Sequence, residues 1–167
     1  MKTLWIATLG IALLIPAGAQ TLDINLDALS AKAKEKAEIT LEGDMLTKAL
    51  EAVPDKARAS VGNIKRLLVR HYEFAQAGQY SDADIDAIRK QVSGAAGWAR
   101  VISTKEDHES VDIYMLNQSG QTAGFLLIAA EEKELTVVHV IGSIDLASLK
   151  EVVDSTIQYD LKSAAGQ

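Results

Sequence analysis

Four strand-like runs follow one another in the second half of the chain and constrain its fold more than any other feature. They cover residues 98–105, 110–118, 122–130 and 134–141 and are rich in apolar and β-branched residues. Each is joined to the next by a short polar turn of hairpin length, which favours pairing between successive strands. The pattern therefore predicts an antiparallel four-stranded meander.

The first half of the chain alternates between helical and strand patterns. We expect a helix over residues 27–34, capped by Asp27, and then a strand that ends at Gly43. A second helix should stop at Pro54, and the apolar run over residues 64–74 predicts another strand. The apolar positions of the second helix are Met45, Leu46, Ala49, Leu50 and Val53.

Two further helices are predicted from capping residues and apolar periodicity. Ser81 should cap the first, with Asp84 completing a capping box, and Asp145 should start the second. Their apolar stripes are Ile85, Ile88 and Val92, and then Leu146, Leu149, Val152 and Val153. The whole order predicts an α+β fold. It consists of an antiparallel sheet of about five to six strands with a C-terminal four-strand meander, packed against three to four helices.

The strand at residues 110–118 nearly alternates between apolar and polar positions. Its two sides are Val111, Ile113 and Met115 on one and Ser110, Asp112 and Tyr114 on the other. Such alternation is typical of a strand with one buried face. We therefore expect the first three residues to face the core.

The next two strands carry more apolar residues than a single buried face requires. Their additional apolar side chains are Phe125, Leu127, Val138 and Val140. These strands could be central strands covered on both faces, or their second face could meet another subunit, a protein partner or an apolar ligand. The four residues form our candidate interaction surface.

Residues 1–19 have the pattern of a cleavable secretion signal. Lys2 supplies the positive start, an apolar run too short to span a membrane follows, and cleavage is expected between Ala19 and Gln20. The chain has no cysteine, so we expect neither a lipid anchor nor a disulfide. These features predict an exported, soluble periplasmic or extracellular protein with one α+β domain over residues 20–167 and no stable membrane anchor after cleavage.

The charge balance disfavours anionic partners. Without the signal the chain keeps 16 basic residues against 23 acidic ones, a net charge of −7 with the histidines neutral. The basic residues are scattered rather than gathered in one stripe. Because nucleic acids and anionic lipid surfaces repel such a protein, we expect neither as a partner.

The sequence contains no familiar catalytic or metal-binding pattern. None of its histidines, at positions 71, 108 and 139, stands in an HxxxH or HExxH arrangement. Asp82, Asp84 and Asp86 have the spacing of a calcium loop but lack its glycine and its final glutamate, and they suit the first turn of a helix. We therefore predict no catalytic residue, no cofactor and no metal ligand.

Four runs carry a resemblance to a known family. They are AEITLEGDM at residues 37–45, LVRHYEFAQAGQY at 68–80, GWARVISTKE at 97–106 and AAEEKELTVVHVIGSIDLASL at 129–149. Together they resemble the bacterial exported family called domain of unknown function 4252. The resemblance implies an exported α+β domain of unestablished function with no active site to map onto this chain. It also suggests envelope signalling as a setting, since some relatives resemble companions of extracytoplasmic sigma-factor systems.

Three functional hypotheses follow. The first is a non-enzymatic envelope protein that uses its sheet surface to bind a protein partner or a second copy of itself. The second is a carrier of a small apolar molecule, which requires a cavity of roughly 300 Å³ or more. The third and weakest is an enzyme with an unfamiliar carboxylate site that involves Glu73 or Asp112.

Overall fold

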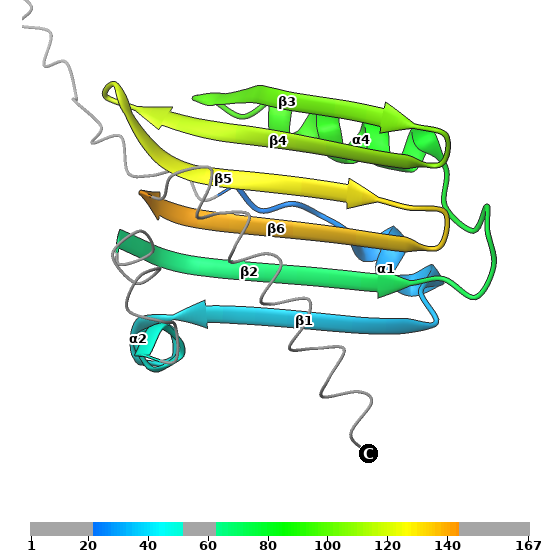
Figure 1. Ribbon diagram of the computed structural model, residues 1–167, viewed down its shortest axis with the longest axis horizontal. Coiled ribbons are helices and arrows are strands. Elements are labelled where there is room, and N and C mark those ends of the chain that lie inside the picture. The colour runs from blue at the N-terminus through cyan, green and yellow to red at the C-terminus, as the bar shows by residue number, and fades with distance from the viewer. Residues whose placement is uncertain (1–21, 52–62, 144–167) are drawn as a thin grey trace, which may run out of the picture.

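The computed structural model describes residues 22–51 and 63–143. The strands are β1 (Glu35–Glu42), β2 (Asn63–Glu73), β3 (Trp98–Glu106), β4 (Glu109–Gln118), β5 (Gln121–Ala130) and β6 (Glu134–Ser143). The helices are α1 (Asp27–Lys32), α2 (Gly43–Glu51) and α4 (Asp82–Ser93). The six strands form one antiparallel sheet in the order β1-β2-β6-β5-β4-β3 (Figure 1). The α+β class and the C-terminal four-strand meander are therefore confirmed.

The sheet has two different faces. On the first, which we call the α4 face, residues 22–26, α1 and α4 pack against the strands, behind the sheet in Figure 1. The opposite face, which we call the α2 face, meets α2 near one end of β1 and β2. Each face has its own cluster of buried apolar residues.

The core under α4 combines helix and sheet residues. Ile85, Ile88 and Val92 are buried on α4, as their helical spacing predicts. They belong to one cluster with Tyr114 and Leu126, which are also buried. Fully burying an aliphatic side chain contributes about 1.5–3 kcal/mol, so this contact is a main source of stability for the α4 face.

The start of α4 follows the capping pattern of the sequence. The Asp84 carboxylate accepts hydrogen bonds from the Ser81 backbone N–H at 2.8 Å and from the Ser81 hydroxyl at 2.9 Å. Asp82 and Asp84 lie in the first turn, where negative charge complements the helix dipole. The predicted capping residues are confirmed.

The start of α1 differs from the prediction. Asp27 is the first residue inside this helix, and Leu26 takes the N-cap position. The Asn25 side chain accepts a hydrogen bond from the Asp27 N–H at 3.0 Å. A negative charge in the first turn interacts favourably with the helix dipole, so Asp27 can stabilise α1 without being its N-cap residue.

β4 has one fully buried face, as its alternation predicts, but the buried side is the opposite of the expected one. Asp112 and Tyr114, which were expected away from the core, are 0% and 1% exposed on the α4 face. Val111, Ile113 and Met115 lie on the α2 face and are only partly buried. The reason is that α4 covers the side with the polar residues and supplies an ion pair for the buried Asp112 carboxylate.

Several predicted features lie outside the described residues. They are the signal at 1–19 with its cleavage point at Ala19 and Gln20, the positions Val53 and Pro54, and the helix that starts at Asp145. Within 22–51 and 63–143, no helix is long and apolar enough to cross a membrane.

Candidate interaction face

The four candidate interaction residues lie together on the α2 face. Phe125 of β5 pairs with Val140 of β6, and Leu127 of β5 pairs with Val138 of β6. Phe125, Val138 and Val140 are 3%, 2% and 0% exposed, whereas Leu127 is only partly buried. The structure therefore brings the four together as one cluster at the middle of this face, with Leu127 as its accessible member.

The strand register extends this cluster across all six strands, from β1 to β3. The inner apolar row consists of Ile39, Val69, Val138, Leu127, Ile113 and Ile102. The outer apolar row consists of Leu41, Leu67, Val140, Phe125, Met115 and Ala99. Side chains directly opposite one another on a sheet are in contact range, so each row is a continuous apolar band.

Beyond the inner apolar row the α2 face changes character. The next row, which we call the small-residue row, consists of Ala37, His71, Thr136, Ala129, Val111 and Thr104. Its polar members are joined by a hydrogen bond of 2.9 Å between His71 Nδ1 and Thr136 Oγ1. This row separates the apolar bands from the charged end of the sheet.

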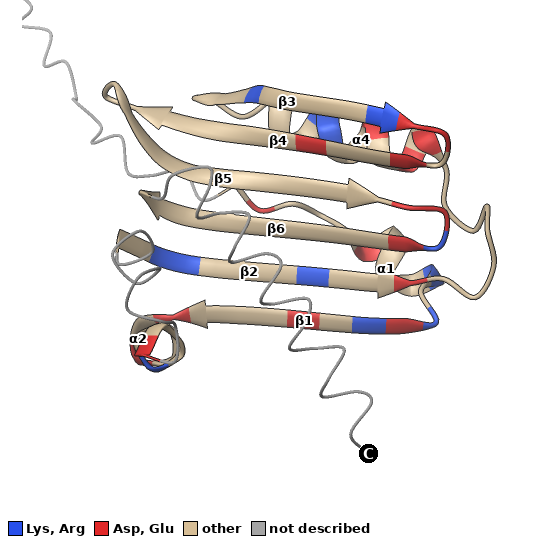
Figure 2. Cartoon of the chain, in the orientation of Figure 1, with Lys and Arg blue, Asp and Glu red and all other residues tan. Residues whose placement is uncertain are grey.

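The last row contains glutamates from the ends of the strands. Its members are Glu35, Glu73, Glu134, Glu131, Glu109 and Glu106, which we call the glutamate row. Glu131 follows β5 directly, and its backbone N–H donates to the Glu134 carbonyl at 2.8 Å. Figure 2 shows acidic residues gathered at this end of the sheet.

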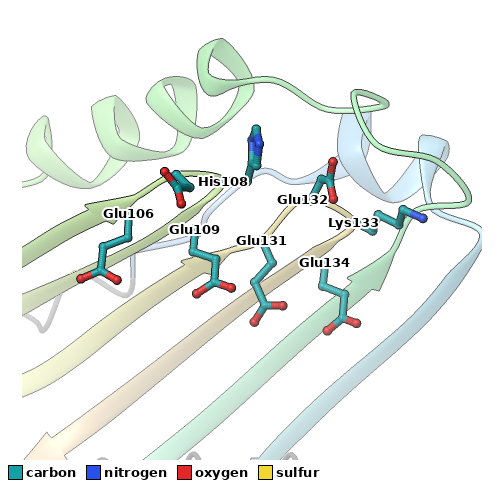
Figure 3. A pocket seen from close by; sticks show the side chains of 8 residues that line it. Glu106, His108, Glu109, Glu131, Glu132, Lys133 and Glu134 are labelled. Carbon is teal, nitrogen blue, oxygen red and sulfur yellow. The ribbon is translucent and has the colours of Figure 1, made fainter.

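A groove of about 490 Å³ lies beside the glutamate row, between the β3–β4 and β5–β6 turns. Its lining residues are Glu106, Asp107, His108, Glu109, Glu131, Glu132, Lys133 and Glu134. In Figure 3, the carboxylates of Glu106, Glu109, Glu131 and Glu134 extend from one side of the sheet, whereas His108 and Glu132 point to the other. The four glutamates therefore present their charges together.

These four glutamates have few positive neighbours, because Lys133 is the one basic residue that lines the groove with them. Among the described residues none of the four forms an ion pair, although Glu35 pairs with Lys34 and Glu73 lies 3.9 Å from His71. Burial, followed by the charges of Glu134 and Glu109, raises the pKa of the Glu131 carboxyl. Like charges opposite one another destabilise a sheet, so this end of the molecule would gain from a cation.

The carboxylate of Asp112, one of the two residues suggested for an enzymatic site, is instead part of a buried ion-pair cluster. Its Oδ2 accepts from Arg89 Nε at 2.7 Å and lies 2.6 Å from the same guanidinium at Nη2. Its Oδ1 accepts from the Ser103 hydroxyl at 2.7 Å and from Arg100 at 3.4 Å. With both oxygens engaged, Asp112 of β4 links α4 and the edge strand β3 to the sheet.

The second suggested carboxylate, Glu73, lies in the glutamate row opposite Glu35 and Glu134. It is on the α2 face, whereas Asp112 is on the α4 face, so the structure does not bring the two together. Within the described part of the chain, no three histidine, aspartate or glutamate residues are arranged to hold a metal ion.

The three histidines occupy separate positions in the fold. His71 is in the small-residue row, and His108 is in the exposed β3–β4 turn. His139 is 6% exposed, its ring stands edge-on to Trp98 at a centroid distance of 5.4 Å, and its Nε2 has no hydrogen-bond partner. Burial, followed by the charges of Arg66 and Arg70, lowers the pKa of His139 to about 4. His139 is therefore a neutral core residue near pH 7.

The cavities between described residues do not resemble a site for an apolar ligand. The groove of about 490 Å³ exceeds the size such a ligand needs, but charged side chains line it. A second cavity of about 200 Å³ is lined by residues such as Asp23, Glu38 and Arg70, and a third holds only about 20 Å³. These linings give the carrier hypothesis no support.

Sequence reasoning found the centre of the α2 face but missed its extent. Ile39 and Val69 join Val138 only through the pairing of β2 with β6, which no local pattern reveals. Ile113 joins Leu127 through the pairing of β4 with β5, which the predicted meander already implies. The glutamate row did have a signal, because glutamates occupy the strand ends next to the turns. Adding hairpin register to that observation would have placed four of them, Glu106, Glu109, Glu131 and Glu134, side by side.

Comparison with known proteins gave one match. The chain matches the family described as Domain of unknown function (DUF4252) over residues 30–152, which confirms the resemblance seen in the sequence. No curated protein and no solved structure matches the chain.

Proposed function

This chain belongs to the DUF4252 family, and we propose that it is an exported, non-enzymatic binding module that uses the α2 face of its sheet. The single observation that carries this proposal is the pair of apolar rows that crosses all six strands. Contiguous apolar surface of this kind is typical of interaction sites.

The accessible part of the face away from α2 lies over β3, β4 and β5. Ile102, Ile113, Met115 and Leu127 are partly exposed there, whereas the members of the same rows on β2 and β6 are buried. Ile39 and Leu41 of β1 are also partly exposed, but α2 packs against that strand. A partner that covers these four side chains would remove apolar surface from water at about 25 cal/mol per Å². We therefore place the contact on the β3–β5 half of the face.

The alternatives have less support. An enzyme built on Asp112 would need a carboxylate that can reach substrate, and Asp112 is 0% exposed with both oxygens bonded. A carrier would need an apolar cavity, whereas the lining of the groove of about 490 Å³ is mostly acidic. A binding role in envelope signalling is compatible with the proposal and follows from the family resemblance alone.

Native mass spectrometry tests the proposal directly. The full chain is purified from the envelope fraction of its own organism and compared with the double variant Ile113→Thr/Leu127→Thr, which makes the accessible rows more polar. Val101→Thr is the matched control, because Val101 is 44% exposed but sits at the β3 bulge outside both rows. We expect a bound polypeptide or second copy on the wild type and the control, and its loss from the double variant.

Two outcomes would contradict the proposal. If all three proteins are bare monomers, the face has no partner under native conditions. If the bound species remains on Ile113→Thr/Leu127→Thr while circular dichroism shows intact folding, the contact lies elsewhere on the molecule.

A further inference from the structure

The side chains of the α2 face change from apolar to acidic along the strand direction, and this change suggests what the face binds. Apolar rows occupy one part, the small-residue row follows, and the glutamate row closes the far end. Adjacent rows are two residues apart on each strand, so the inner apolar row and the glutamate row are about 13 Å apart. A helix with side chains is about 10–12 Å in diameter, so one helix could contact both.

The charge on the four rows has one sign. The four rows contain no lysine or arginine, and His71 is their one ionisable residue besides the glutamates. Glu106, Glu109, Glu131 and Glu134 converge beside the groove of about 490 Å³ without an ion pair among the described residues. The lining adds Lys133 as one basic residue beside six acidic ones, so the groove keeps a negative excess that a basic partner would complement.

A second copy of the chain fits this face poorly. Its own four rows would present the same glutamates and no lysine or arginine, so a second copy packed through them would add no basic residue to the acidic groove, whose lining has only Lys133. An isologous contact adds like charges rather than opposite ones. The charge pattern favours a different polypeptide as the occupant.

Pairing of a partner strand with the sheet edge is also disfavoured. The edge strand β3 is interrupted by a bulge at Val101, and Lys105 near its end is paired with Asp82 at 2.7 Å. The other edge strand, β1, carries several charged residues. Bulges and charges of this kind protect sheet edges from further strand pairing.

We propose that the α2 face binds a cationic amphipathic helix of another protein. The inference rests on the proposed function and names its partner class. Apolar side chains of the helix cover Ile102, Ile113 and Leu127, and lysine or arginine side chains on its flank reach into the groove between the two hairpin turns. Long basic side chains can lie along apolar surface while their charged ends reach acids, which suits the spacing of the rows.

Binding of designed peptides to the full chain tests the partner class. The probe is a fluorescein-labelled 14-residue helix with leucine on one side and lysine on the other, followed by fluorescence anisotropy at low salt. The comparison peptides replace lysine with glutamate, or leucine with serine. We expect the leucine–lysine peptide to bind at least roughly tenfold more tightly than either, because the face requires apolar contact and positive charge together.

Charge variants locate the contact. Glu109→Gln/Glu131→Gln removes two charges from the groove and should weaken binding of the leucine–lysine peptide roughly fivefold. Asp23→Asn/Asp27→Asn is the matched control, because it removes two exposed charges on the α4 side of the sheet and should change affinity less than roughly twofold.

Three results would overturn this inference. They are absence of peptide binding, equal binding of the leucine–glutamate peptide, and equal loss of affinity in the two charge variants. A dimer of the full chain that dissociates in Ile113→Thr/Leu127→Thr would identify a second copy as the occupant and also overturn it. In that last case the proposed function survives, because the native mass spectrum still shows a species that depends on the face.

Discussion

Changing Asp112 to asparagine would test how α4 is held to the sheet. The substitution keeps the shape of the side chain but removes the charge that two arginines share. In the native protein the Asp112 oxygens lie 2.6–2.7 Å from donors of Arg89 and Ser103. In the variant the amide nitrogen of the asparagine, itself a donor, would face at least one of these donors. The Arg89 side chain, 20% exposed, would keep its charge in a mostly buried place.

The expected cost follows from this geometry. Removing one partner of a buried ion pair destabilises a protein by about 3–5 kcal/mol. Arg89 retains a hydrogen bond to Asp86 at 2.9 Å and some contact with water, so we expect the lower end, about 3 kcal/mol. Arg100 lies 3.4 Å from the same carboxylate with its side chain 49% exposed, and Arg100→Ala should cost only about 0.5 kcal/mol.

Urea denaturation followed by circular dichroism would measure both values. Asp112→Asn should lower the midpoint while the slope of the free energy of unfolding against urea stays unchanged. The double variant Asp112→Leu/Arg89→Met, which replaces the pair with apolar side chains, should be less destabilised than the sum of its single changes. A cost for Asp112→Asn below about 1 kcal/mol, or equal to that of Arg100→Ala, would refute this account of the cluster.

Two further predictions concern His139 and the start of α4. Because burial and then Arg66 and Arg70 hold the His139 pKa at about 4, against 6.5 for the free side chain, the unfolded chain takes up the proton first as the pH falls. The folded state should therefore lose about 3 kcal/mol between pH 6.5 and pH 4, and urea titrations of His139→Gln should show a flatter dependence over that range; an unchanged dependence would argue against a neutral buried imidazole. Ser81→Ala removes the hydroxyl that donates to Asp84 and should cost about 1 kcal/mol in thermal melts. Ser93→Ala, at the exposed last residue of α4, should cost much less, and equal costs would disprove the capping role.

The local features of this fold could be predicted from the sequence. The hairpin-length turns predicted the meander from β3 to β6, and the spacing of Ile85, Ile88 and Val92 predicted the buried side of α4. Both depend on residues close together in the chain, where periodicity and turn chemistry act.

Long-range features could not be predicted in the same way. The place of β2 beside β6 depends on contacts between residues 63–73 and 134–143, and no local pattern specifies them. The buried side of β4 was predicted wrongly because the alternation of polar and apolar residues assigns the charged Asp112 to the solvent side. Its burial is possible because Arg89 of α4 forms an ion pair with it. The apolar rows were found only where two neighbouring strands both showed an excess, at Phe125 and Val138.

The position of β6 has a consequence for the order in which the molecule can fold. Among the described strands, β1 and β2 form one pair and β3, β4 and β5 form one ladder, and only β6 is hydrogen-bonded to both groups. β6 is also the last described strand to leave the ribosome or a translocation channel. Until it arrives, β2 and β5 are open edges next to apolar side chains, which is the situation in which chains aggregate or need a chaperone. The sheet therefore closes late, through contacts of long sequence separation, and we expect its folding rate to be set by the capture of β6.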